Sequence, residues 1–339
     1  MKMRKLITMA LAGVLAAATL AGCGGSGSSA SSGAAASDSK ASSAAASSAA
    51  AESSDKKISV GFTNMADTDV FCKYAMDKFV GMAEAEGWEV TTADANQDSA
   101  KQVSQVEQFI AKGVDYIVIE AVDSDAIVPA IKEANQAEIP VICLICDANG
   151  GEFTYVGSDN AQCGRAIGEY FHEILPENAK IIFLAGTAGL SHSTLRHDGF
   201  FEALDRDDVE VLADIDCDFV RETAMKTTTD LLQANPQVDA IVSANDQMAL
   251  GAIQALKAAG REGVLVNGVD ATVDGMNAIK DGDMTFSMLY NGIVQAENTV
   301  DVIKKMEAGE KVDERIISEF EVVDADNVDQ KYEEIYGDD

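Results

Sequence analysis

Several apolar segments of the chain end in a side chain that can hydrogen-bond a hydroxyl group or stack on a ring. Asn245 follows the apolar residues 240–242, and Asp270 ends another apolar run. Carboxylate and amide oxygens accept protons from hydroxyl groups, and an arginine donates in a rigid fork. Aromatic rings offer flat apolar faces to the C–H side of a hydroxylated ring. The candidates of these kinds are Asp69, Phe71, Glu120, Asp147, His192, Thr194, Arg196, Phe219, Asn245, Asp270 and Tyr290.

Each candidate also has a structural interpretation that the sequence leaves open. Asp69 and Asp246 can cap helices, because an Asp side chain just before a helix accepts a backbone N–H. Phe219 can belong to a core, and Glu120 can pair with a basic neighbour. We favour a binding role because side chains of complementary chemistry follow many strand ends. The expected acceptors are Asp69, Glu120, Asn245 and Asp270, the expected donor is Arg196, and the expected flat faces are Phe71, Phe219 and Tyr290.

A sheet must position these side chains, because strand-like and helix-like segments alternate from Lys57 onward. Such alternation predicts an α/β fold, a parallel sheet with helices on both faces. The plan occurs twice, so we expect two doubly wound lobes, with ligands at the carboxyl ends of the strands. The first half has strands in ISVGFT, WEVTTADA, YIVIEA, VICLIC and TYVGSD, with helices near 70–86, 98–112 and 125–137. The second half has strands in IIFLAG, VEVLAD, AIVSA, VLVNGVD and TFSMLY.

Four motifs give the chain a specific resemblance: VDYIVIEAVDSDAIVPAIKEANQAEIPVI, GSDN, SANDQMALGAIQALKAAG and VNGVDATVDG. With these motifs the chain resembles the extracytoplasmic sugar-binding proteins of ABC importers, of the ribose and galactose type, which have the type I periplasmic-binding fold. The likeness covers residues 57–325. It implies a three-strand hinge, with crossings near Gly157-Ser158, Leu289-Asn291 and Ser318-Phe320. The implied lobes are 57–157 with 291–318, and 158–290 with 319–339.

The resemblance also implies that a small molecule, most of all a monosaccharide, binds between the lobes and is delivered to the permease subunits of an ABC importer. This sequence departs from the ribose-binding pattern at several positions. Ile145-Cys146-Asp147 replaces an Asp-Arg pair, Thr194 replaces a second arginine, and Glu120 and Tyr290 stand where the relatives have amides. Two donors are lost and a carboxylate is gained, so a polyol, a nucleoside or an amine-bearing solute stays an alternative cargo. A ligand-sensing lipoprotein is an alternative role.

The first 56 residues belong to neither lobe in this interpretation. Three basic residues precede an apolar run, 6–20, that ends in LAGC, which is the pattern of a bacterial lipoprotein signal peptide spanning 1–22. Cys23 would then carry the lipid and hold the protein at the outer face of the cell membrane. Residues 23–56 are rich in Gly, Ser and Ala, as in a flexible tether. A serine-rich tether on a lipidated binding protein favours a Gram-positive host.

Charge and motif content argue against several other classes of protein. Loss of the signal peptide removes three of 25 basic residues and leaves 22 against 57 acidic ones, a net charge of −35. Nucleic acid is therefore not an expected partner. No GxGxxG lies between a strand and a helix, and no Walker or GxSxG motif occurs, so we expect neither an enzyme nor a cofactor. His172, His192 and His197 lack metal-ligand spacing. Cys143 and Cys146 share one strand-like run, which favours core packing over redox chemistry.

Overall fold

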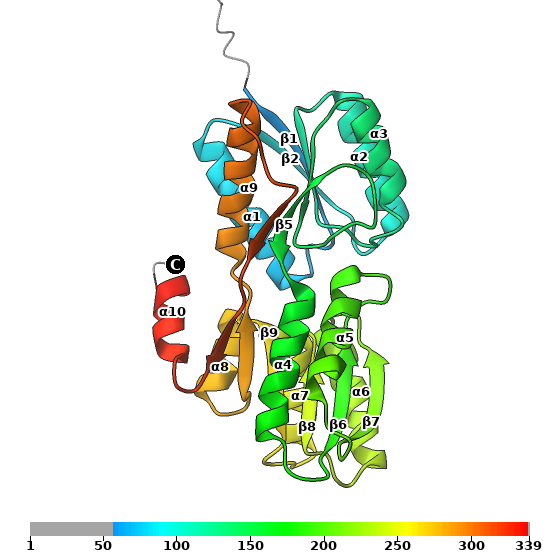
Figure 1. Cartoon of the computed structure of the whole chain (residues 1–339), viewed down its shortest axis with the longest axis vertical. Coiled ribbons are helices and arrows are strands. Elements are labelled where there is room, and N and C mark those ends of the chain that lie inside the picture. Colours follow the sequence, from blue (N-terminus) through cyan, green and yellow to red (C-terminus); the bar gives the residue numbers. More distant parts are fainter. Residues whose placement is uncertain (1–56, 338–339) are drawn as a thin grey trace, which may run out of the picture. The chain divides into compact units, whose positions relative to one another are not determined.

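The computed structural model describes residues 57–337. The predicted signal peptide, the lipidation site Cys23 and the tether lie outside these residues. Within the described residues the strands are collected in two sheets, each flanked by helices (Figure 1). The sequence prediction of two doubly wound α/β lobes is confirmed, and the predicted strands and helices lie within a few residues of the observed ones.

The N-terminal lobe is built on the first sheet, with strand order β11-β5-β4-β3-β1-β2 and parallel pairing throughout. Its strands are β1 (Ser59–Asn64), β2 (Glu89–Asp94), β3 (Tyr116–Ile119), β4 (Val141–Leu144), β5 (Thr154–Ser158) and β11 (Arg315–Ser318). Its helices are α1 (Val70–Ala85), α2 (Ser99–Lys112), α3 (Val128–Gln136) and α9 (Gly292–Glu307).

The C-terminal lobe is built on the second sheet, with strand order β12-β10-β9-β8-β6-β7. Its strands are β6 (Lys180–Ala185), β7 (Glu210–Asp216), β8 (Ala240–Ser243), β9 (Leu265–Asp270), β10 (Phe286–Leu289) and β12 (Glu321–Asp324). Its helices are α4 (Asn160–Ile174), α5 (Ser191–Leu204), α6 (Arg221–Ala234), α7 (Asp246–Ala258), α8 (Val273–Lys280) and α10 (Val328–Tyr336).

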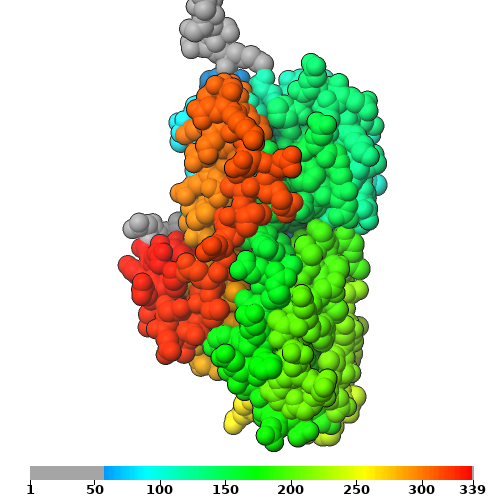
Figure 2. Space-filling view, viewed as in Figure 1, coloured from blue at the N-terminus to red at the C-terminus, as the bar shows by residue number. Residues whose placement is uncertain are grey.

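The chain passes between the two sheets three times, after β5, after β10 and after β11. Only residues 319–320 separate β11 from β12. Because β12 enters the second sheet from the end at which β10 stops, it pairs antiparallel with β10, a departure from the parallel sheet predicted by the alternation. Figure 2 shows the surface at these crossings, where dark orange residues near the C-terminus lie beside green residues from the middle of the chain; β5, which pairs with β11, is buried beneath them.

Local sequence explains where these elements begin. Every residue of β3 and of β4 is buried, as expected for aliphatic strands covered by helices on both faces. Several helices begin directly after a capping side chain that accepts a backbone N–H; these caps are Asp69, Asp98, Asp159, Asn245, Thr272 and Asn291. Aromatic rings such as Phe62 on Phe79, and Phe171 on Phe286, pack between sheet and helices in the two lobes. These cores hold the strand ends, and the loops after them, in place.

Candidate functional site

A small inner cavity of about 20 Å³ is lined by residues that follow the carboxyl ends of strands in both lobes. This is the edge at which open α/β sheets bind ligands. The N-terminal lobe contributes Met65, Asp69, Phe71, Cys72, Ile145 and Cys146, and the C-terminal lobe contributes His192, Arg196, Phe219, Asn245, Asp270 and Tyr290. The structure therefore brings together eight of the eleven side chains expected from the sequence.

His192 and Arg196 lie one turn apart on α5 and so share a face of that helix. Arg196 is only 4% exposed; its Nε donates to Asn160 Oδ1 at 2.9 Å and its Nη1 to the Ala244 carbonyl oxygen at 2.7 Å. These bonds fix the guanidinium group at the cavity wall. The His192 ring stacks on Phe219 with centroids 5.1 Å apart. Burial, assisted by Arg196, lowers the pKa of His192 to about 3, so its imidazole is neutral.

Asn245 and Asp270 bring hydrogen-bonding groups to the same wall. Asn245 caps α7, where its Oδ1 accepts the Met248 N–H at 2.9 Å. Asp270 ends β9 with a φ of 108°, a backbone conformation that residues other than glycine rarely adopt. Within residues 57–337 its carboxyl group has no hydrogen-bond partner. Burial, and then the nearby Asp246, raise the pKa of Asp270 well above its ordinary value. Asp270 is thus an unused acceptor in a cavity that also holds a fixed donor, Arg196.

Asp246, the second residue of the Asn-Asp pair, has a structural role. Its Oδ2 accepts the Thr272 N–H at 2.7 Å and the Thr272 hydroxyl at 2.8 Å, and its Oδ1 accepts the Ser287 hydroxyl at 2.7 Å. Glycines make room for this fully buried carboxylate, because a Cβ at Gly268 would lie 2.0 Å from Oδ1 and one at Gly275 2.1 Å from Oδ2. The network fastens the start of α7 to the end of β9.

Asp69 and Phe71 belong to the opposing wall, at the start of α1. Asp69 caps this helix, because its Oδ1 accepts the Cys72 N–H at 2.8 Å. Burial raises the pKa of Asp69. The Phe71 ring stacks on Tyr290 with centroids 4.9 Å apart and an interplanar angle of 30°. Since Tyr290 follows β10 at the second crossing, this aromatic pair joins the two lobes at the cavity.

A tight turn after β4 decides which side chains reach the cavity from this strand. Ile145 has a φ of 63°, in the left-handed region, and the Cys146 N–H donates to the Leu144 carbonyl oxygen at 2.6 Å. Cys146 thereby lines the cavity, whereas Asp147 does not and instead pairs with Arg315 at 2.8 Å. The expected ligand contact from Asp147 is therefore absent from this cavity, and sequence reasoning missed Cys146.

Glu120 and Thr194 also lie outside the inner cavity. Thr194 is exposed, because it stands on α5 midway between His192 and Arg196 and so points to another side of the helix. Glu120 follows β3 and is fully buried, and neither carboxyl oxygen has a hydrogen-bond partner. Burial raises the pKa of Glu120 well above its ordinary value. Glu120 does not line this cavity, and its contact with a ligand stays a prediction.

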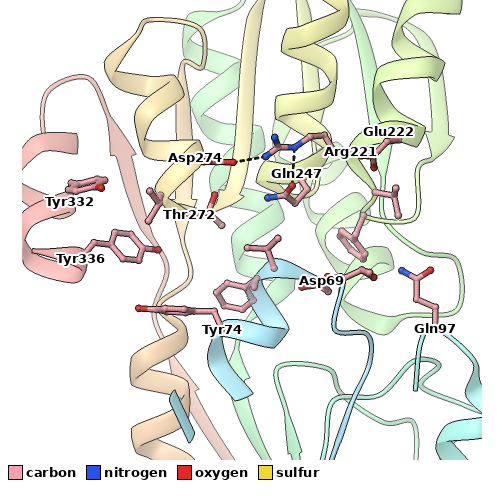
Figure 3. A pocket seen from close by; sticks show the side chains of 16 residues that line it. Asp69, Tyr74, Gln97, Arg221, Glu222, Gln247, Thr272, Asp274, Tyr332 and Tyr336 are labelled. Carbon is pink, nitrogen blue, oxygen red and sulfur yellow. Dashed lines mark hydrogen bonds and ion pairs between the residues drawn. The ribbon is translucent and has the colours of Figure 1, made fainter. Parts of the chain in front are cut away.

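A larger outer cavity of about 1010 Å³ adjoins the inner one, and the two share Asp69, Phe71 and Phe219 as lining residues. In Figure 3 it lies between the start of α1 and the starts of helices of the C-terminal lobe. Tyr332 and Tyr336 on α10 form one side of it.

Other kinds of site are not found in the part of the chain that the structure describes. Among residues 57–337, no group of three or more His, Cys, Asp or Glu side chains is placed to hold a metal ion. The same residues contain no helix with the length and apolar character needed to cross a membrane. The five cysteines of this part are free and buried, as core packing predicts for Cys143.

Comparisons with known proteins agree with the geometry. Residues 60–311 match the family described as periplasmic binding protein domain. The chain is 37% identical to the ribose import binding protein of Salmonella typhimurium over 231 residues, which is 68% of this chain and 78% of that protein. It is 31% identical to a xylitol-binding protein of Mycolicibacterium smegmatis over 283 residues, 83% of this chain and 80% of that protein. Among solved structures, a galactofuranose binding protein superposes with a TM-score of 0.79 at 26% identity, covering 83% of this chain and 99% of that one.

Proposed function

The chain belongs to the periplasmic binding protein family, and from this premise we propose that it is the extracytoplasmic solute-binding component of an ABC importer. Its ligand is a small polyhydroxyl molecule, in particular a monosaccharide, that binds between the residues that line the inner cavity. Because a cavity of about 20 Å³ holds about one water molecule, the lobes must move apart to admit this ligand. The relatives at 30% identity or more include proteins named for ribose and for xylitol, which supports a sugar or a polyol as the ligand class.

The observation that carries this proposal is the pairing of fixed polar groups with flat apolar faces in one cavity. Arg196 on α5 supplies a donor, and Asn245 after β8 and Asp270 at the end of β9 supply acceptors, all from one lobe. Phe71 and Phe219 supply ring faces from opposite lobes. A hydroxylated ring needs both, because its hydroxyl groups must be hydrogen-bonded when buried and its C–H faces pack on aromatic rings.

Binding between lobes also provides a signal to a permease. A ligand that contacts both lobes binds more tightly when the lobes lie together than when they lie apart. This difference in affinity stabilises the arrangement with the lobes together. We place the hinge at 157–158, 289–291 and 318–320, so that one lobe is 57–157 with 291–318 and the other is 158–290 with 319–339. The ends of β5, β10 and β11 support these boundaries. The permease subunits of the importer are the protein partner in this proposal.

No catalytic role is proposed. His192 is the one histidine at the cavity, and its Nδ1 has no hydrogen-bond partner among the described residues, so nothing there orients it as a general base. The family consists of substrate-binding proteins of transport systems, which supports the same conclusion.

Anchoring is proposed from the sequence alone. LAGC after the apolar run predicts that residues 1–22 are removed as a signal peptide and that Cys23 is lipidated, which would hold the protein at the cell membrane. The serine-rich tether favours a Gram-positive host. Cys23→Ser should move the protein from the membrane fraction to the soluble extracytoplasmic fraction. A variant that stays with the membrane would contradict the anchor.

The function is tested by thermal unfolding of the full chain carrying Cys23→Ser, with a panel of pentoses, hexoses, polyols, amino sugars and nucleosides. A ligand at 100 times its Kd stabilises a protein by about 2.7 kcal/mol, which raises the Tm of a chain of this size by a few degrees. We expect a neutral sugar or polyol to give such a rise. Stabilisation by nucleosides or amines alone would contradict the proposed ligand class.

A further inference from the structure

The two walls of the inner cavity differ in chemistry. The C-terminal lobe presents five hydrogen-bonding side chains there, His192, Arg196, Asn245, Asp270 and Tyr290, and among the described residues the Tyr290 hydroxyl has no hydrogen-bond partner. The N-terminal lobe presents five apolar or weakly polar side chains, Met65, Phe71, Cys72, Ile145 and Cys146, with Asp69 as its one charged group at the cavity. A ligand bound in this cavity therefore meets a polar wall on one side and a largely apolar wall on the other.

The polar atoms that the N-terminal wall does contain are already engaged. The Cys72 N–H donates to Asp69, and the N–H groups of Ile145 and Cys146 donate to main-chain carbonyl oxygens at 2.8 and 2.6 Å. The thiols of Cys72 and Cys146 are only weak donors and acceptors. One oxygen of Asp69 accepts the helix N–H, which leaves the other as the acceptor for a ligand.

Glu120 adds no polar group to the N-terminal wall of the inner cavity. It is absent from the residues that line the inner cavity, it is 0% exposed, and the described residues offer its two oxygens no hydrogen bond. A carboxyl group buried behind the wall presents no accessible oxygen to the ligand. The edge of the ligand that faces Cys72, Ile145 and Cys146 must therefore satisfy its own polar groups or have none.

We infer that this cavity selects a deoxy sugar: a ring with hydroxyl groups on the edge toward the C-terminal lobe and with hydrogen or methyl, in place of one hydroxyl, on the edge toward the N-terminal lobe. The inference rests on the proposed function and narrows its ligand class. Arg196, Asn245 and Asp270 serve the hydroxylated edge. Cys72 and Cys146 are the residues that determine the preference at the other edge.

The expected size of the preference follows from the cost of burying an unpaired hydroxyl. A hydroxyl pressed against this wall loses its bonds to water and gains none, whereas a methyl group gains from burial. We expect a deoxy sugar to bind about 10- to 100-fold more tightly than the parent sugar that differs from it by that hydroxyl, which is about 1.4–2.8 kcal/mol.

The test is titration calorimetry of the full chain carrying Cys23→Ser with matched pairs of sugars. Each pair has the same stereochemistry and differs by one hydroxyl: galactose with 6-deoxygalactose, glucose with 6-deoxyglucose, and ribose with 5-deoxyribose and with 2-deoxyribose. We expect at least one pair in which the deoxy member binds tenfold or more tightly. Equal or tighter binding of the parent in every pair that binds would overturn the inference while leaving the proposed function standing.

Two further outcomes separate the inference from its premise. Tighter binding of an amino sugar than of both its parent and its deoxy form would mean that Asp69 or Glu120 meets the ligand as an anion, and it would overturn the apolar edge. Failure of every sugar and polyol to bind would contradict the proposed function itself, and the inference would fall with it.

Substitutions of Cys72 and Cys146 test whether the N-terminal wall of the inner cavity causes the preference for a deoxy sugar. Cys72→Ser and Cys146→Ser replace a thiol by a hydroxyl of similar size, which is a better partner for a ligand hydroxyl. At least one of them should reduce the preference for the deoxy sugar by threefold or more. Cys143→Ser is the matched control, because Cys143 is buried on β4 and does not line the cavity. The Cys143→Ser protein should prefer the deoxy sugar by the same factor as the protein without this substitution. An unchanged preference in both cavity variants, with Tm values showing that they fold, would overturn the assignment.

Discussion

Asp270→Asn distinguishes a ligand-binding role of Asp270 from a structural role. A binding role predicts weaker ligand binding with unchanged or higher stability, whereas a structural role predicts lower stability. Asp270 is 5% exposed, its carboxyl group has no hydrogen-bond partner within residues 57–337, and its pKa is raised by burial and by Asp246. Asparagine has the same shape and tolerates the φ of 108° better than most residues. The substitution therefore removes the ionisable group with little change in the backbone.

Binding should weaken in this variant. A hydrogen bond contributes about 0.5–1.5 kcal/mol, and asparagine replaces one acceptor oxygen by a donor, so at least one bond from a ligand hydroxyl is lost. That loss is about 2- to 13-fold in Kd. Asp274→Asn is the matched control, since the Asp274 side chain is 62% exposed on α8 and its pairing with Arg221 lies at the outer cavity. The control should bind as the parent does.

The melting temperature of Asp270→Asn should be equal to that of the parent protein or higher. An acid whose pKa is higher in the folded protein than in the unfolded chain is destabilising when ionised, and this cost grows as pH rises from the unfolded pKa to the folded one. Without ligand at pH 8, Asp270→Asn should thus melt at the same temperature as the parent or higher, and the difference should shrink as pH falls. Calorimetry and thermal unfolding measure both effects. A Kd within twofold of the parent, or a Tm several degrees lower, would refute the reasoning.

Three further changes test the supports of the site. Gly186→Ala should weaken ligand binding by about threefold to tenfold, because a Cβ there would lie 2.0 Å from the Phe219 ring and would displace it. Gly81→Ala is the control and should leave affinity unchanged, because nothing lies within 4 Å of a Cβ at that position. Equal affinities of the two variants would argue against a contact between the ligand and the Phe219 ring. Asp246→Ala should lower the free energy of unfolding by about 2–4 kcal/mol, since three hydrogen bonds are lost, and denaturant unfolding that shows less than 1 kcal/mol would contradict this. The pKa of His192 is lowered to about 3, so its contribution to the free energy of unfolding is present above pH 6.5 and is lost as pH falls. Between pH 7 and 4 the free energy of unfolding of the parent protein should fall by about 3 kcal/mol more than that of His192→Gln. Parallel pH profiles of the two proteins would contradict a buried neutral imidazole.

Much of the fold could be predicted from the sequence, because alternating apolar segments specify strands and helices locally. The strand ends identified in this way also placed the residues of the C-terminal lobe wall, such as Asn245 and Asp270, at one edge of a sheet. The antiparallel β12 was not predicted, since its direction depends on a crossing of two residues and on no pattern within the strand itself.

Thr194 and Asp147 were expected at the ligand but do not line the inner cavity, and in both cases local backbone geometry is the reason. Thr194 and Arg196 are two residues apart, but α5 begins at Ser191, so only helical spacing decides which of them faces the cavity. Asp147 was expected at the ligand, yet the left-handed Ile145 turns Cys146 inward instead. Backbone turns of this kind follow from packing around them and leave little trace in a single sequence.

Glu120 shows a further limit of sequence reasoning. Its strand is buried on both faces, so the alternation of side chains gives no indication of which face meets the ligand. A carboxylate at a strand end suggests an acceptor, but the same position can hold a carboxyl group buried behind the cavity wall. The depth of such a group is known only from the structure.

The central claim, that both lobes hold a polyhydroxyl ligand in the inner cavity, is tested most directly by a crystal structure of the protein with the solute that stabilises it most. We expect ligand hydroxyl groups within hydrogen-bond distance of Arg196, Asn245 and Asp270, with an apolar face of the ring against Phe71. A ligand found only in the outer cavity, or contacting one lobe alone, would contradict the account.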